Sequence, residues 1–172
     1  MTKDEIQLLF EYDRWANNRV FQAASTLSAE QFTRDLGGGF RSVRDTLVHI
    51  LAGEWGWLTY WKEVSPGSAF LNDLWDGIDA VFNPDRFPDF PAVKSKWAEL
   101  EEQQLEFVNA VTNESLKKML PVRTTQLSLA NLLQHLANHS TYHRGQVALM
   151  MQQLAAKPIP TDFALFLLEG RR

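Results

Sequence analysis

The stretch 132–151 reads LLQHLANHSTYHRGQVALMM and holds three of the four histidines in this chain of 172 residues. His135, His139 and His143 follow one another at steps of four residues. Residues four apart on an α-helix lie on one face, with Cβ atoms about 6 Å apart. The spacing therefore predicts a long helix that carries a ridge of imidazoles. The remaining histidine, His49, lies in a second apolar pattern, TLVHILAGEW.

Four long helices are predicted from apolar residues that recur at helical spacing. The first three cover about residues 2–24, 42–62 and 90–111. The fourth begins after Ser128, which caps it, and runs to about residue 156. Helices of roughly 20 residues are about 30 Å long, a length typical of a four-helix bundle. The chain length suits one domain over residues 1–172.

The connectors decide the expected topology. The segment 64–89, with turn dipeptides such as Asn83–Pro84, is predicted to be irregular and long enough to cross the end of the bundle. The second and third long helices would then be parallel, in an up-down-down-up order. The segment 112–128 is predicted to be a second irregular connector, and short helices are expected after Ser28 and in residues 161–170. Because no segment shows the alternation of a strand, the expected fold class is all-α.

The composition argues against several classes of partner. The net charge is −4 and the chain has no basic block, whereas a nucleic-acid surface needs clustered Lys and Arg. No apolar run approaches the ~18 residues of a membrane span. The N-terminal segment is polar where a signal peptide would be apolar, so we expect a cytoplasmic protein. The chain lacks cysteine, so any metal must be held by nitrogen and oxygen ligands.

The histidine spacing is suited to a metal ion. Two imidazoles at i and i+4 can bind one ion through nitrogens at ~2.0–2.1 Å. His135 and His143 are about 12 Å apart along the helix axis, a distance at which the two rings could reach the same ion only under strain. The ligand pair is therefore His135 with His139 or His139 with His143, and His49 would supply a third ligand from another helix. No glutamate follows a histidine of the ridge, so the HExxH motif of zinc proteases is absent.

Helical spacing places several side chains near His49. Asp45, one turn earlier, could orient the His49 ring by accepting its free N–H, or could act only on the helix N-terminus. Gly53 and Gly56 lie inside the predicted helix, where glycine costs about 1 kcal/mol relative to alanine. They therefore predict a close helix approach or a small cavity. Arg144 is expected to face away from the histidine ridge.

Three further residues are candidates for contact with a substrate. Tyr142 and Gln146 share the histidine face of the last long helix, where a polar side chain can bind a substrate or be purely structural. Trp75 lies in the connector 64–89 and could either cover the site or fill the end of the bundle.

Four segments carry a resemblance to a known family. HLANHSTYHRGQV, residues 135–147, resembles the signature of the DinB-like family of metal-dependent enzymes, also called YfiT-like. YDRWANNRVF, VRDTLVHILAGEWGWL and PTDF resemble other segments of that family in the same order, so that the resemblance covers nearly the whole chain. It implies an up-down-down-up four-helix bundle, often dimeric, with a divalent ion held by three histidines.

The resemblance also implies roles for individual residues. Carried over to this chain, the metal ligands are His49, His139 and His143, and His135 is left with a hydrogen-bonding role beside them. The expected ion is zinc or nickel, with manganese, iron or cobalt as further candidates, because imidazole binds all of them. Some relatives are S-transferases that use low-molecular-weight thiols.

Three functions are compatible with such a site. The first is a metal-dependent enzyme that activates a small thiol for S-transfer to a small electrophile; the thiol must be a co-substrate, since the chain has no cysteine. The second is a metal-hydroxide hydrolase. The third is a non-enzymatic dimeric bundle in which the ion only joins two helices. The expected partners are a small-molecule substrate and a second copy of the chain.

Overall fold

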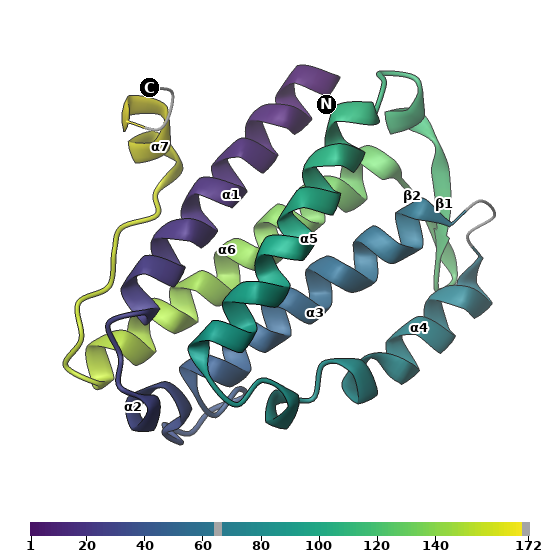
Figure 1. Ribbon diagram of the computed structural model, residues 1–172. Helices are drawn as coiled ribbons and strands as arrows, with labels where there is room; N and C mark the ends of the chain where they lie inside the picture. The colour runs from purple at the N-terminus through teal and green to yellow at the C-terminus, as the bar shows by residue number, and fades with distance from the viewer. Residues whose placement is uncertain (64–66, 170–172) are drawn as a thin grey trace.

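The computed structural model describes residues 1–63 and 67–169, which are mostly helical (Figure 1). Four long helices lie close to the predicted positions: α1 (Lys3–Ala24), α3 (Val43–Lys62), α5 (Phe90–Ala110) and α6 (Leu129–Gln153). The remaining elements are short: α2 (Ala29–Thr33), α4 (Ser68–Val81), α7 (Phe163–Glu169), the 3₁₀ turns η1 (Pro84–Arg86) and η2 (Ser115–Lys117), and the strands β1 (Met119–Val122) and β2 (Thr125–Ser128).

The helix starts follow the predicted caps. The Ser42 hydroxyl accepts a hydrogen bond from the backbone N–H of Asp45 at 3.1 Å, and Ser128 does the same for Asn131 at 3.2 Å. Ser28 forms a complete capping box with Gln31 at the start of α2. Each cap satisfies a backbone donor that the first turn of a helix leaves free, so these serines fix where the helices begin.

The prediction of an irregular segment 64–89 is wrong over α4, which has 14 residues. The segment SAFLNDLWDGIDAV places apolar residues at helical spacing, including Leu71, Trp75 and Ile78. Flanking prolines and an internal glycine hid this pattern in the sequence. Residues 64–66 of the predicted segment lie outside the described part of the chain.

The all-α expectation is also wrong at residues 119–128, where β1 and β2 form an antiparallel hairpin with Met119 opposite Ser128. Strands of four residues are too short for their alternation to be recognised, and Pro121 argues against a strand because it lacks a backbone donor. Arg123 adopts φ 53° in the two-residue turn. The Tyr60 hydroxyl of α3 donates to the carbonyl oxygen of Pro121, which ties the hairpin to the helices.

The four long helices pack around one main apolar core. Helices α1 and α3 each contact both α5 and α6, and the hairpin packs against α4 and α6. Figure 1 shows α4 along the outer side of α3, away from α1. Among residues 1–63 and 67–169, no helix combines the length and the hydrophobicity needed to cross a bilayer.

A buried ion pair joins α1 to α6 within this core. Arg144 is 1% exposed, and its Nη1 donates to Asp13 Oδ1 at 2.5 Å and to Asn17 Oδ1 at 2.7 Å. Burial alone would lower the pKa of Arg144, but the charge and hydrogen bond of Asp13, together with Tyr12, outweigh this effect and hold that pKa above its usual range. Arg144 therefore faces away from the histidine ridge, as the helical spacing predicts.

Glu54 joins α3 to the same buried region. Its carboxyl group is hydrogen-bonded to Ser140 Oγ at 2.6 Å and to Gln104 Nε2, so that three long helices meet at one side chain. Burial, and next the negative charge of Asp13, raises the pKa of Glu54 from 4.5 to about 8. The group is consequently protonated at neutral pH, and the core holds a neutral carboxylic acid beside the Asp13–Arg144 pair.

Replacing Glu54 by glutamine is expected to stabilise the fold, and more so at pH 8 than at pH 5. Between the unfolded pKa near 4.5 and the folded pKa near 8, the unfolded chain loses this proton and the folded chain keeps it. The free energy of unfolding of the wild type therefore falls as pH rises through this window. Glu54→Gln removes the effect, which at about 1.4 kcal/mol for each pKa unit amounts to about 4 kcal/mol at pH 8.

Thermal unfolding of metal-free protein at both pH values tests this expectation. Glu102→Gln, an exposed change of the same charge on α5, is the control and should leave the pH dependence of Tm unchanged. An equal Tm difference between Glu54→Gln and wild type at pH 5 and pH 8 would show that Glu54 is ionised in the folded protein.

Candidate metal centre

Three histidines from two helices meet at one point between α3 and α6. Ring nitrogens of His49, His139 and His143 all lie within 4.8 Å of one another, a separation at which the three could hold a metal ion. His139 Nε2 lies 3.2 Å from His49 Nε2. The rings of His49 and His139 lie 4.5 and 4.4 Å from that of His143, centroid to centroid. Of the two pairs that the spacing allowed, the structure brings together His139 and His143.

The electrostatics keep two of these imidazoles neutral. Burial, and next the charge of His143, lowers the pKa of His49 to about 4, with a smaller opposing effect of Asp79. Burial, and next the charges of His143, His49 and His135, lowers the pKa of His139 to about 4. Neutral imidazole is the form that binds a metal, so both rings are ready to act as ligands at neutral pH.

Two details of the ring contacts bear on ion binding. Two neutral rings with nitrogens 3.2 Å apart repel each other unless a proton or a cation lies between them. In addition, His139 Nδ1 is buried and has no hydrogen-bond partner among the described residues, so the polar contact of this ring is made through Nε2 toward His49. The donor set of three imidazole nitrogens suits zinc, nickel and other divalent ions.

Gln146 contacts a histidine of the cluster directly. The Nδ1–H of His143 donates to Gln146 Oε1 at 2.7 Å, which leaves the Nε2 lone pair of His143 free for an ion. A partner of this kind fixes the tautomer and orientation of a metal-binding histidine. Tyr142 lies beside the same ring, 5.0 Å between centroids, but is 67% exposed.

Asp45 and His135 lie farther from the point where the three rings meet. Asp45 Oδ1 accepts a hydrogen bond from Arg44 Nε at 3.0 Å, and the hydrogen bonds found among the described residues do not join Asp45 to His49. This arrangement favours the second role expected for Asp45, an interaction with the N-terminus of α3, over the orientation of the His49 ring. The His135 ring packs against Trp57 at 5.6 Å, and burial lowers the pKa of His135.

Phe40 is a neighbour of the site that the sequence analysis missed. Its ring stacks on His49 with centroids 4.1 Å apart and meets the edge of His143 at 5.3 Å. The preceding Gly37 and Gly38 adopt φ of +76° and +90°, a conformation that other residues rarely take. These two glycines turn the chain so that the Phe40 ring covers the histidines.

The two glycines of α3 mark close approaches, as predicted. A Cβ atom at Gly53 would lie 3.0 Å from His139 Cε1, so the imidazole occupies the space that a side chain would need. A Cβ atom at Gly56 would lie 2.8 Å from Cη2 of Trp75, which belongs to α4. Gly53 therefore leaves room for the His139 ring, and Gly56 leaves room for the Trp75 ring.

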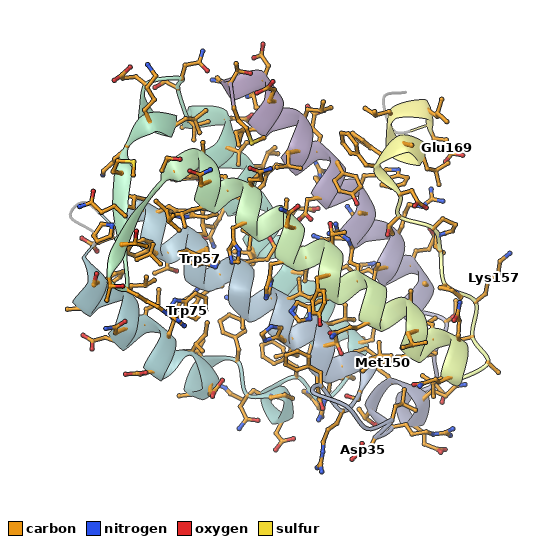
Figure 2. All side chains as sticks on the ribbon, turned by 180° about the vertical axis from the view of Figure 1, so that it is seen from behind. Asp35, Trp57, Trp75, Met150, Lys157 and Glu169 are labelled. Atoms are coloured by element: carbon orange, nitrogen blue, oxygen red, sulfur yellow. The ribbon has the colours of Figure 1, made fainter. Side chains whose placement is uncertain are left out.

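A cavity of about 730 Å³ opens beside the cluster, and His49, His135 and His139 line part of it. Trp57 of α3 and Trp75 of α4 form an aromatic wall, with their ring centroids 5.6 Å apart (Figure 2). The other lining groups include Asp76 and Asp79 of α4 and Arg123 of the hairpin turn. Trp75 therefore lines the site itself, which was one of the two roles expected for it.

The Gly53 contact leads to a specific expectation. Gly53→Ala should displace the His139 ring and shift its imidazole resonances, while the usual gain of about 0.5–1 kcal/mol for Gly→Ala in a helix is lost to the clash. Gly145→Ala on α6 is the matched control, because a Cβ atom there meets nothing within 4 Å. Proton–nitrogen NMR of the imidazoles and thermal unfolding measure both effects, and identical behaviour of the two variants would contradict the close contact.

Comparison with known proteins finds relatives that match most of the chain. A model of the DinB family matches residues 1–170. Protein DinB of Bacillus subtilis (strain 168) is 26% identical over 166 residues, which cover 92% of this chain and 91% of that protein. The crystal structure of a DinB-like protein from Bacillus cereus ATCC 10987 matches with a TM-score of 0.51 at 16% identity, over 86% of this chain and 91% of that one, and shows a shared fold. Because the family model spans nearly every residue, the chain belongs to the DinB family.

Proposed function

We propose that this protein is a divalent-metal-dependent enzyme in which His49, His139 and His143 hold the ion. The observation that carries the proposal is the convergence of three ring nitrogens within 4.8 Å of one another beside a large cavity. Zinc or nickel is the expected ion, and manganese, iron or cobalt would also suit imidazole ligands. Three neutral ligands leave the charge of the ion uncompensated, which is typical of catalytic rather than structural sites.

The reaction that we propose is S-transfer from a low-molecular-weight thiol to a small electrophile. When bound, a divalent ion lowers the pKa of a thiol and favours its thiolate form. The sulfur then forms a bond to the electrophilic carbon, the leaving group departs with its electron pair, and the thiol proton passes to water. The absence of cysteine from the chain means that both reactants must enter from solvent.

Residues of the cavity support the binding of two small reactants. The wall formed by Trp57 and Trp75 offers apolar surface next to His139 and excludes water from that side. Arg123, at the hairpin turn, can pair with an anionic group of a substrate, and the carboxylate of Asp76 can pair with a cationic one. A cavity of about 730 Å³ is within the range of small-molecule sites.

A hydrolase is the second candidate, and Asp79 is the observation that favours it. Asp79 lines the same cavity and its negative charge acts on His49, so a carboxylate is available near the ion site as a general base for water. The non-enzymatic alternative keeps the ion as a link between α3 and α6 only.

We also propose the finer architecture expected of the family: an up-down-down-up bundle of α1, α3, α5 and α6 that forms a homodimer. The course of the chain in Figure 1 supports the first part, since α3 and α5 run in one direction and α1 and α6 in the other. Tyr142 and Leu149 support the second part, because they are 67% and 57% exposed on one face of α6.

Metal content per chain is the first test. Untagged wild type is expected to hold about one ion per chain by elemental mass spectrometry, and His143→Ala is expected to lose it, since two ligands bind far more weakly than three. His135→Ala is the matched control on the same helix and should retain the ion. If no ion binds to wild type after incubation with zinc, nickel or manganese, the metal-dependent functions are wrong.

Activity of the metal-loaded protein separates the candidate reactions. Thiol transfer predicts consumption of a small thiol and an alkyl halide that stops when a chelator removes the ion. Hydrolysis predicts ester cleavage without thiol that falls about 10²-fold or more in Asp79→Asn. A tightly bound ion with neither activity would favour the structural role between α3 and α6.

A further inference from the structure

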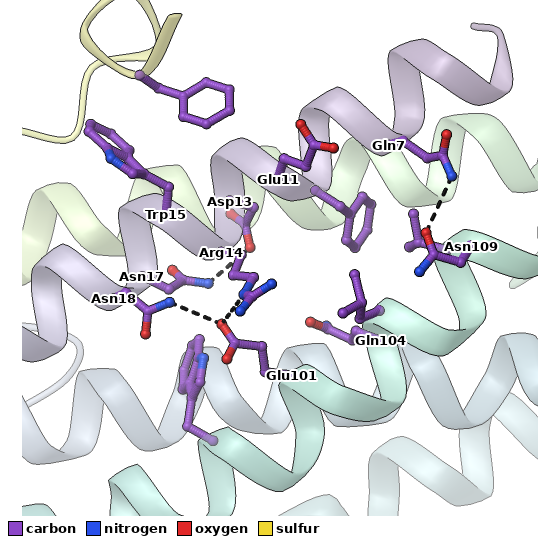
Figure 3. A pocket seen from close by; sticks show the side chains of 15 residues that line it. Gln7, Glu11, Asp13, Arg14, Trp15, Asn17, Asn18, Glu101, Gln104 and Asn109 are labelled. Atoms are coloured by element: carbon purple, nitrogen blue, oxygen red, sulfur yellow. Dashed lines mark hydrogen bonds and ion pairs between the residues drawn. The ribbon is translucent and has the colours of Figure 1, made fainter. Parts of the chain in front are cut away.

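A second cavity, of about 290 Å³, lies between α1 and α5 and shares no lining residue with the histidine cavity. Trp15, Trp97 and Phe10 supply apolar walls, and Phe166 of α7 closes one side. Figure 3 shows the polar side chains that surround the same space, with Asp13 and Asn17 from α1 and Glu101 and Gln104 from α5. The proposed metal chemistry leaves this cavity without a role.

The polar floor of this cavity is held rigidly. Asp13 and Asn17 are 3% and 4% exposed, and the Asn17 amide donates to Asp13 Oδ2 at 2.9 Å while Arg144 binds both residues from the far side. Gln104 is fixed by its hydrogen bond to the buried Glu54. Side chains locked in this way are pre-organised for a ligand, because binding costs little of their conformational entropy.

The charges around the cavity favour a cation. Three carboxylates line it, those of Glu11, Asp13 and Glu101, against one guanidinium, that of Arg14. Arg14 Nε pairs with Glu101 Oε1 at 3.2 Å, and Asp13 pairs with Arg144. The net negative charge of the lining is then that of Glu11, an exposed residue at the edge of the cavity. A carboxylate-rich cleft with low-dielectric walls concentrates positive ligands.

The volume limits the size of that ligand. At about 30 Å³ for each water-sized group, the cavity has room for about ten non-hydrogen atoms. Aromatic walls suit an apolar body, and aromatic rings also attract an adjacent cation. We propose that the α1–α5 cavity is a second binding site, for a small amphipathic amine whose ammonium group meets the carboxylates and whose body packs between Trp15 and Trp97.

The tryptophans allow this site to be observed separately from the histidine cavity. Of the six tryptophans, Trp15 and Trp97 line the α1–α5 cavity, whereas Trp57 and Trp75 line the other. The full-length protein is labelled with 5-fluorotryptophan, and its fluorine resonances are assigned with Trp→Phe variants. Titration with 2-phenylethylamine is expected to shift the Trp15 and Trp97 resonances with saturation, and to leave those of Trp57 and Trp75 in place.

Two controls test the charge argument. 3-Phenylpropionate has a similar body and a negative charge, and should cause no saturable shift of Trp15 or Trp97. Glu101→Gln should weaken amine binding about fivefold or more, whereas Glu102→Gln, the exposed neighbour outside the cavity, should change it less than about twofold.

The proposal is overturned by any of three results. The first is no shift of Trp15 and Trp97 at amine concentrations up to about 10 mM. The second is equal binding of the amine and the carboxylate, which would remove the charge preference. The third is a response confined to Trp57 and Trp75, which would place the amine in the histidine cavity. None of these results depends on whether the histidines bind a metal.

Discussion

The approach of α3 to α6 at Gly53 governs the geometry of the histidine cluster. The His139 imidazole lies where a side chain at Gly53 would be, with Cε1 only 3.0 Å from the position of a Cβ atom. This contact brings His139 Nε2 to 3.2 Å from His49 Nε2, across two helices that are far apart in sequence. A larger residue at this position would separate the helices and with them the histidines. Glycine lowers the helix propensity of α3 here, but it allows α3 and α6 to approach each other closely.

Helix α6 is also held on the face next to the histidine ridge. Ser140 and Arg144 directly follow His139 and His143, and they bind Glu54 of α3 and Asp13 of α1. Any rotation of α6 about its axis would break these buried hydrogen bonds, and unpaired buried polar groups cost about 1–3 kcal/mol each. The polar contacts therefore set the direction of the histidines, and the neutral state of Glu54 keeps the core from holding an unpaired negative charge.

Much of this arrangement could be predicted from the sequence, because local spacing determines it. The four-residue steps of the histidines, the capping serines and the interior glycines each have a direct structural meaning. The choice between the two histidine pairs, by contrast, depends on the position of α3 relative to α6, which spacing alone does not contain. The same holds for Phe40 and Glu54, whose partners come from other helices and leave no periodic signal.

The segments whose secondary structure was predicted wrongly lie in one part of the fold. Helix α4 and the β1–β2 hairpin were both missed, and both line the cavity beside the histidines through Trp75, Asp79 and Arg123. These elements are short and depend on contacts with α3 and α6 for their stability, so their patterns are weak in the sequence.

Under the proposed function, ligands and substrate pocket thus come from different parts of the fold. The ion would be held by long helices whose core packing constrains their sequence strongly. The groups that would select a substrate lie on α4 and the hairpin, where Asp76, Asp79 and Arg123 face the cavity outside the buried core and can change with little cost to it. A fold of this kind can keep one metal site and vary its substrates, and the identity of the substrate must be sought in the residues that face the cavity from these two elements.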